Sequence, residues 1–221
     1  MVLRVRSIIK QALHKKISHI DFEQAVFVGE SLSTKIETIK VCHTLLQNPK
    51  FFSLLLQIDA ELAAQTHATK CGCGGVLHRA NYPRKPKACP KEVVCDFEWR
   101  WSFCCSMCRK RSTPMSVRFL GRRVYIALAV VVLAVKRNKI NEAITDLVAT
   151  LGVPERTVAR WRQWWLGRFP ATTLWQSTCA RFMPPVPIAD LPTSLMTRFT
   201  GVAHEAMLRL LNFLSPLSVR C

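Results

Sequence analysis

The sequence predicts a mainly α-helical protein that carries one small β zinc ribbon. Three observations support this fold class. Apolar residues recur at helical spacing toward both ends of the chain, cysteine pairs flank an alternating aromatic segment, and a glycine turn separates two short amphipathic stretches. The expected order is N-terminal helices (1–69), a zinc ribbon with basic arms (70–121), a helix-turn-helix bundle (122–170) and a C-terminal helical tail (171–221).

Residues 1–69 are expected to form helices that pack together or against a partner. Asp21 and Gln24 have the spacing of a capping box, and Asn48 and Pro49 fit the N-cap and first position of a later helix. No candidate catalytic residue stands out here. One apolar helical face near the start comprises Val5, Ile8, Ile9, Ala12 and Leu13.

The chain contains ten cysteines, a number that suggests a chemical role for some of them. Its start lacks the apolar run and cleavage site of an export signal, so a reducing cytoplasm is expected, where clustered cysteines more often bind metal than form disulfides. Glycines after a ligand let backbone N–H groups point at sulfur. Four thiolates around one Zn²⁺ would make a closed, structural site. The expected ligands are Cys71, Cys73, Cys105 and Cys108.

The ligand set stays open at this stage, because one residue separates Cys71 from Cys73 where a zinc knuckle usually has two. The alternatives are His78, Cys89, Cys95 and Cys104. The segment before the second pair alternates apolar and polar residues and predicts a single strand. Its two faces would carry Phe97, Trp99, Trp101 and Phe103 on one side and Asp96, Glu98, Arg100 and Ser102 on the other.

The stretch INEAITDLVATLGVPERTVARWRQWW predicts two helices that meet at a sharp corner. The first should run from about Asn141 to Thr150, Gly152 should adopt the positive φ of the turn, and Pro154 should lie in the first turn of the second helix. This pattern is typical of a helix-turn-helix, although a helical hairpin with a solvated basic face is the alternative. The inward positions are Leu147, Val148, Leu151, Val153, Val158 and Trp161.

The second helix is expected to present side chains that read DNA. Arginine can pair with guanine through two hydrogen bonds, and glutamine with adenine. The candidates are Glu155, Arg156, Thr157, Arg160 and Gln163. Arg162 and Lys139 are expected to contact phosphates, which position a protein without reading sequence. Trp164 and Trp165 should close the corner against an apolar helix formed by Val124 to Val135.

The formal net charge of +18 favours a polyanionic partner, and nucleic acid more than a membrane surface. Residues 71–165 hold 18 basic and six acidic residues, a net of +12, against eight and six, a net of +2, in residues 1–69. Two basic arms are expected to follow the DNA backbone. The first arm comprises His78, Arg79, Arg84, Lys85 and Lys87, and the second comprises Arg109, Lys110, Arg111, Arg118, Arg122 and Arg123.

The apolar run from Val124 to Val135 is too short to cross a membrane. Twelve residues span about 18 Å as a helix, whereas a bilayer core is about 30 Å thick. We therefore expect a buried helix.

The strings CGGVLHRANYPRKP and FCCSMCRKRSTPMSVRFLGRRVY, followed by a helix-turn-helix that ends in RWRQWW, resemble a group of bacterial mobile-element proteins. These are transposon or insertion-sequence accessory proteins in which a zinc ribbon precedes a DNA-binding helix-turn-helix. The resemblance covers roughly residues 50–215. It implies binding of double-stranded DNA, bound Zn²⁺, and a transposase or another mobile-element protein as a partner.

The sequence gives little sign of an enzyme. A two-metal transposase needs converging carboxylates, and the acidic residues here are few and scattered. The expected function is therefore that of a transcription factor or transposition accessory that binds DNA. The alternatives are a small DNA-processing enzyme and an RNA-binding scaffold whose aromatic residues stack on bases.

Overall fold

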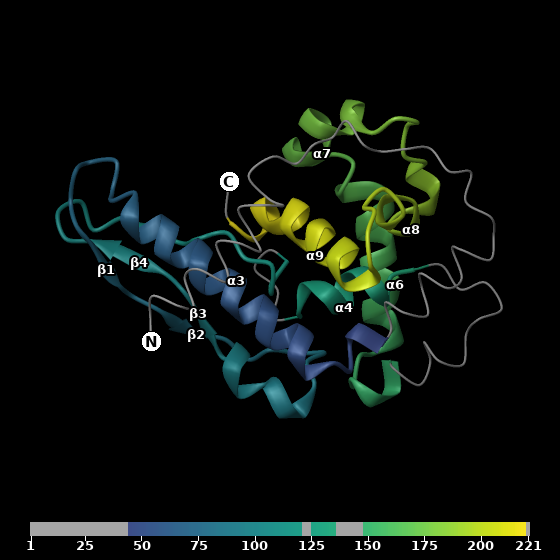
Figure 1. Ribbon diagram of the computed structural model, residues 1–221, viewed down its shortest axis with the longest axis horizontal. Coiled ribbons are helices and arrows are strands. Elements are labelled where there is room, and N and C mark those ends of the chain that lie inside the picture. The colour runs from purple at the N-terminus through teal and green to yellow at the C-terminus, as the bar shows by residue number, and fades with distance from the viewer. Residues whose placement is uncertain (1–43, 121–124, 136–147, 220–221) are drawn as a thin grey trace.

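The computed structural model describes residues 44–120, 125–135 and 148–219 of the 221-residue chain. These residues form a mainly helical fold, with two small sheets toward one end of the long axis and most helices toward the other (Figure 1). The helices are α3 (Pro49–Ala68), α4 (Ala127–Val132), α6 (Glu155–Gln163), α7 (Thr173–Thr178), α8 (Thr193–Met196) and α9 (Ala203–Leu214). The strands are β1 (Leu77–Arg79), β2 (Tyr82–Pro83), β3 (Trp99–Arg100), β4 (Phe103–Cys105) and β5 (Arg111–Ser112). The helices expected before residue 44 lie outside the described residues.

Helix α3 begins where the sequence predicts. The side-chain oxygen of Asn48 accepts hydrogen bonds from the N–H groups of Lys50 at 3.0 Å and Phe51 at 3.4 Å, and Pro49 occupies the first turn. One face of the helix is buried. Its residues are Phe51, Phe52, Leu55, Asp59 and Ala63, so a carboxylate lies within an otherwise apolar stripe and needs a buried partner.

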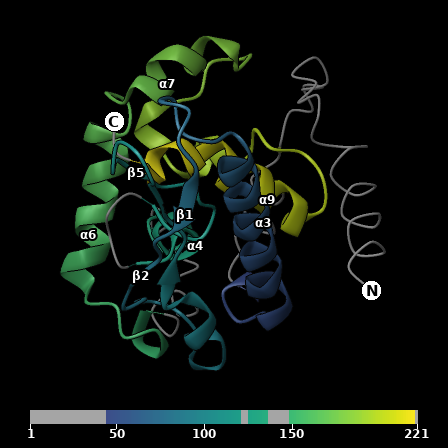
Figure 2. The same ribbon diagram turned by 90° about the vertical axis from the view of Figure 1, so that its left-hand side faces the viewer.

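The sheets are small and antiparallel. Strand β4 lies between β1 and β5 in a three-stranded sheet, and β2 pairs with β3 in a second sheet. Leu77 of β1 lies opposite Cys105 of β4. Both side chains are buried in a small cluster with Phe103 and with Ala63 of α3. Helix α3 therefore covers one face of the three-stranded sheet (Figure 2).

The single strand predicted from residue 97 to 103 is wrong. A 3₁₀ turn at Cys95–Phe97 precedes β3, and β4 belongs to the other sheet. Because the chain changes sheets between β3 and β4, the alternation of faces breaks. Trp99 is 54% exposed, whereas Arg100 and Ser102, which were expected on the polar face, are buried.

One hydrophobic core connects α3 to the helices at the other end of the molecule. All six residues of α4 are buried in it, as predicted for the apolar run, although the helix is shorter than the predicted one from Val124 to Val135. The indole N–H of Trp165 donates to the carbonyl of Val130 at 3.2 Å, so this tryptophan packs on α4 as expected. Phe52 of α3 and Leu210 of α9 belong to the same core. The helices in the described segments lack the length and hydropathy to span a membrane.

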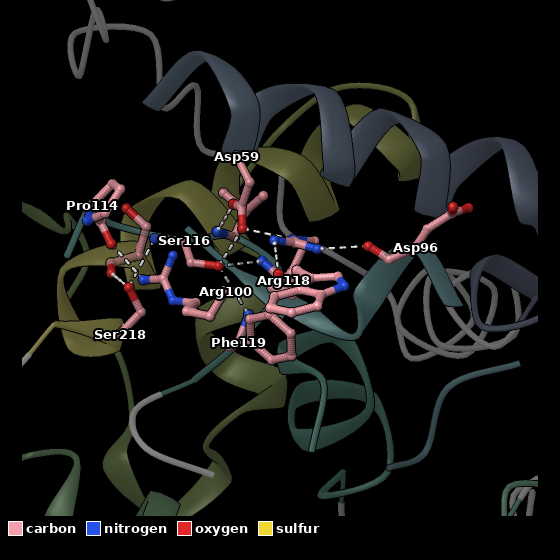
Figure 3. A network of polar contacts seen from close by, with 11 residues as sticks. Asp59, Asp96, Arg100, Pro114, Ser116, Arg118, Phe119 and Ser218 are labelled. Atoms are coloured by element: carbon pink, nitrogen blue, oxygen red, sulfur yellow. Dashed lines mark hydrogen bonds and ion pairs between the residues drawn. The ribbon is translucent and has the colours of Figure 1, made fainter. Parts of the chain in front are cut away.

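The buried carboxylate of Asp59 forms an ion pair with Arg118 (Figure 3). The Nε of Arg118 lies 2.7 Å from Oδ2 of Asp59, and neither side chain is exposed. The hydroxyl of Ser116 and the N–H of Val117 also donate to this carboxylate, at 2.5 and 2.7 Å. Burial lowers the pKa of Arg118, and the charge of Asp59 opposes that shift. The ion pair is thus supported by further hydrogen bonds, as a buried pair must be.

Arg118 also binds the segment that leads into the sheets. Its two terminal nitrogens donate to the carbonyls of Asp96 at 3.1 Å and Trp99 at 3.0 Å, and its guanidinium lies 4.5 Å from the ring centre of Trp101. These contacts contradict the DNA contact predicted for Arg118. The side chain is inside the protein, where Asp59 neutralises it and main-chain carbonyls take its donors.

Replacing Asp59 with Ala should destabilise the protein by about 3–5 kcal/mol, because the substitution leaves Arg118 buried without its counter-charge. Urea unfolding would measure the difference. The matched control is Glu205→Ala, which removes a partly exposed partner of Arg209 on α9 and should cost no more than about 0.5 kcal/mol. Equal stability of the two variants would contradict a structural role for the buried pair.

Candidate metal centre and nucleic-acid interface

The first cysteine turn, residues 71–75, lies directly before β1. The carbonyl of Cys71 accepts from the N–H of Gly74 at 2.8 Å, and the N–H of Cys71 donates to the carbonyl of Gly75 at 3.2 Å. Gly75 is buried, and a Cβ added there would lie 2.5 Å from Sγ of Cys105. The residue at this position must therefore be glycine for the two cysteine turns to approach each other.

The second cysteine turn, residues 105–110, joins β4 to β5. The N–H of Cys105 donates to the carbonyl of Lys110 at 3.1 Å, and the N–H of Met107 donates to Sγ of Cys105 at 3.4 Å. Arg109 completes the turn with a φ of +57°. Main-chain N–H groups thus point at the sulfur, which stabilises a thiolate.

The antiparallel pairing of β1 and β4 brings the two turns together, because the start of β1 lies beside the end of β4. The four thiol sulfurs lie within 4.8 Å of one another. Sγ of Cys71 is 3.6 Å from that of Cys108, and Sγ of Cys73 is 3.4 Å from that of Cys105. All four cysteines are free thiols, so this arrangement can hold a metal ion.

Local hydrogen bonds make the thiols unequal as acids. The backbone of Gly75, followed by the neighbouring thiols, lowers the pKa of Cys73 to about 6. The backbone of Cys108 lowers the pKa of Cys105. The backbone of Lys110 acts to lower the pKa of Cys108, but its thiol neighbours and burial together raise it to about 12. A divalent cation that bound these sulfurs would replace their protons.

The alternative ligands do not join the group of four. His78 is exposed on β1, where it faces Cys104 across the strands. The Sγ of Cys104 lies 3.5 Å from the carbonyl of Arg109. Cys95 is exposed at a 3₁₀ turn, and burial raises the pKa of the Cys89 thiol to about 12. The structure thus brings together the four cysteines selected by spacing.

A helical corner precedes α6. Residues 148–150 are helical, and Gly152 has a φ of +60°, as predicted. The N–H of Val153 donates to the carbonyl of Val148, and that of Gly152 to the carbonyl of Ala149, each at 3.0 Å. This pair of bonds is the Schellman pattern that ends a helix. Pro154 is extended, so α6 begins at Glu155, one residue after it. Residues 136–147, which include most of the expected first helix, lie outside the described residues.

Helix α6 has a buried and an exposed side. Val158 and Trp161 are buried, as predicted. Thr157 is also buried, which contradicts its predicted exposure; its hydroxyl accepts a hydrogen bond from Arg160 at 3.2 Å. The exposed residues among the DNA-reading candidates are Glu155, Arg156, Arg160 and Gln163.

The structure gives Arg162 an internal role in place of the predicted phosphate contact. Its guanidinium donates to the carbonyls of Ala134 at 3.4 Å and Val135 at 3.2 Å, just beyond α4, and the side chain is half-buried. Carbonyls near a helix C-terminus attract such a cation. This contact ties α6 to the end of α4.

The basic arms are largely at the surface. Lys85, Lys87, Arg109, Lys110 and Arg111 are exposed, and Arg84 is partly exposed. Arg122, Arg123 and Lys139 lie outside the described residues. The role of Asp59 was missed from the sequence, although one signal was present: Asp59 follows Phe51 and Leu55 at four-residue spacing, on the apolar face of a predicted helix.

Replacing Gly75 with Ala should weaken metal binding, because the added Cβ would collide with Sγ of Cys105. Gly72→Ala is a matched control in the same turn, where a Cβ would have no atom within 4 Å. Competition with a chromogenic chelator should show earlier metal loss from the Gly75 variant than from the Gly72 variant. The same chelator resistance in both would mean that the turns do not meet as described.

Comparison of the chain with models of protein families, with curated proteins and with solved structures gave no match.

Proposed function

We propose that this protein binds double-stranded DNA, with Zn²⁺ holding its cysteine turns together as a zinc ribbon and α6 acting as the recognition helix of a helix-turn-helix. Its role would be that of a transcription factor or transposition accessory of a mobile element, as the sequence resemblance implies. The observation that carries the proposal is the group of four thiols, Cys71, Cys73, Cys105 and Cys108.

The geometry of the thiols fits zinc. A tetrahedral site with Zn–S bonds of about 2.3 Å has sulfur–sulfur separations of about 3.8 Å. The paired sulfurs of the two turns lie 3.6 and 3.4 Å apart. Thiolates are soft ligands that suit Zn²⁺, and a full set of four protein ligands leaves no open position for a substrate. These features support a structural site.

The small size of the surrounding core supports the same role. The buried cluster beneath the sheet contains four residues, Ala63, Leu77, Phe103 and Cys105. So few apolar side chains give little stabilisation, and domains of this kind use a metal to fold. Binding of Zn²⁺ would therefore contribute directly to the stability of the sheet.

Charge and shape support DNA as the partner. The chain carries a formal net charge of +18, and four thiolates with one Zn²⁺ would lower it only to about +16. Helix α6 exposes Arg156, Arg160 and Gln163, the residue types that read guanine and adenine in a major groove. The turn at Gly152, which ends one helical segment just before α6, supports the helix-turn-helix in this proposal.

One observation favours a second candidate, the RNA-binding scaffold. Trp99 is 54% exposed on β3, and an exposed indole can stack on an unpaired base. Gel shifts with mixed-sequence duplex DNA and with single-stranded RNA separate the candidates. Preference for a duplex that persists at moderate salt supports the proposed function, and equal or tighter binding of the RNA overturns it.

The purified protein should contain one Zn²⁺ per chain, and Cys108→Ser should lose it. The loss should unfold the segment from residue 71 to 112 and lower solubility, because that segment has little core of its own. Elemental analysis and circular dichroism would follow both effects. Cys95→Ser, an exposed thiol outside the group, should keep its zinc. Stoichiometric zinc in the Cys108 variant would remove this residue from the ligand set.

Arg156→Ala and Arg160→Ala should each weaken binding to the preferred duplex by about 1–3 kcal/mol and relax the choice of base at one position. Titration of a duplex selected by the wild-type protein would measure the loss. Lys50→Ala, at an exposed site on α3, should leave sequence preference unchanged. If both arginine variants retain wild-type affinity and preference, α6 does not read bases.

A further inference from the structure

We propose that the open face of the three-stranded sheet, the segment from residue 82 to 87 and α6 form one continuous cationic track that lies along a single duplex. This inference rests on the proposed function and extends it. It states that the sheet contacts DNA and that it does so at a constant distance from the base pairs read by α6.

Among the described residues, the sheet has one face covered by α3 and one open face. Leu77 and Cys105 lie opposite each other on the face beneath α3. The other face presents a row of directly opposed residues, in which Cys104 of β4 lies between His78 of β1 and Arg111 of β5. His78 and Arg111 are exposed, and Cys104 is half-exposed. The face away from α3 thus carries the exposed side chains of His78 and Arg111, and Arg111 is a cation.

Cation–π contacts continue this row into the second sheet. The guanidinium of Arg111 lies 5.5 Å from the ring centre of Tyr82, and that of Arg84 lies 5.6 Å from the same ring. Arg111 also donates to the carbonyl of Ala80 at 2.8 Å, which orients its guanidinium. An oriented guanidinium loses less side-chain freedom when it binds a phosphate than a mobile one does.

The segment from residue 82 to 87 connects this row to α6. The carbonyl of Lys87 accepts from the N–H of Ile126 at 3.2 Å, just before α4. The neighbouring Tyr125 packs edge-to-face on Trp161 of α6, with ring centres 5.0 Å apart. The first basic arm is therefore anchored at both ends and acts as a bridge between the sheet and α6, with Lys85 and Lys87 exposed along it.

The arrangement of the layers places the track on one side of the molecule. Helix α3 covers the sheet from one side, and α6 lies on the side opposite to α3 (Figure 2). The open face of the sheet and the outer face of α6 therefore point in the same direction. A single rod-like partner could contact both.

The charges on the track fit the phosphate backbone. The sequence contains no carboxylate between Lys70 and Lys91, nor between Trp99 and Leu120, so the cations of the sheet and the bridge have none beside them in sequence. The bridge from Tyr82 to Lys87 is five residue steps long, which is at most about 17 Å or about five base pairs. The sheet would then contact phosphates within one helical turn, about 34 Å, of the bases read by α6.

The test combines the salt dependence of DNA binding with a footprint of the protein on the DNA backbone. The bridge variant is Lys85→Ala with Lys87→Ala, and the sheet variant is Arg111→Ala. A matched control, Lys50→Ala with Arg209→Ala, removes the same charge as the bridge variant from α3 and α9. Zinc content would be measured for each, because Arg111 also makes internal hydrogen bonds. The probes are a mixed-sequence duplex and a duplex selected by the wild-type protein.

We expect the slope of log K against log salt to become shallower by about 1.8 in the bridge variant and by about 0.9 in the sheet variant, one phosphate contact for each cation removed. The sheet variant should also lose protection at one end of the footprint and keep it where α6 binds. The control should keep the wild-type slope and footprint.

Three results would decide against part or all of the proposals. If the bridge and sheet variants match the control while the α6 variants lose specificity, the track is wrong and the proposed function stands. If the slope depends on the sheet and the bridge but changes in α6 have no effect, α6 is not part of the track, and both the continuous track and the recognition helix are wrong. If the wild-type protein binds no duplex in dilute buffer, the track and the proposed function both fail.

Discussion

The buried ion pair between Asp59 and Arg118 is the interaction on which the arrangement of the other elements depends. It joins the middle of α3 to the chain that runs from the sheets toward α4, and Arg118 carries the connection on to the carbonyls of Asp96 and Trp99. A buried pair of this kind contributes little net stability compared with apolar packing. The pair favours the placement of α3 that brings Asp59 to Arg118, because any other placement would leave a buried charge without its partner. The position of α3 in turn decides which face of the sheet is open.

The two ends of the molecule are stabilised by different means. The helical end has a continuous aromatic core around α4. In this core the ring centres of Trp165 and Phe169 are 4.8 Å apart, and those of Phe169 and Trp175 are 5.1 Å apart. The sheet end has a cluster of four buried residues and a group of four thiols. In the proposed function a metal takes the place of the core that the sheet lacks. In that function the sheet would be stabilised by metal at its far end, in addition to α3 on one face.

Those features whose chemistry is local could be predicted from the sequence. Asn48 and Pro49 start a helix through bonds made within one turn, and Gly152 ends one for the same reason. The thiols could be selected because cysteine spacing reflects turn geometry. Features that depend on distant partners could not be predicted in this way. Arg118 resembles a surface arginine in sequence until Asp59, 59 residues away, is placed beside it. The alternation from residue 97 to 103 continues without interruption, although the chain changes sheets within it.

Buried basic residues also outnumber buried acidic residues among the described residues. Arg100 is buried close to Arg118, and Asp59 is the one buried acidic residue of the described segments. The Nη2 of Arg100 donates to the carbonyl of Pro114, while its Nε and Nη1 have no partner among the described residues, and burial lowers its pKa. A second buried guanidinium therefore costs stability, in a chain whose surface already repels itself. A polyanion bound only by the folded state would offset both costs, because such binding shifts the folding equilibrium by mass action. In the proposed function, DNA is therefore a stabilising ligand as well as a target.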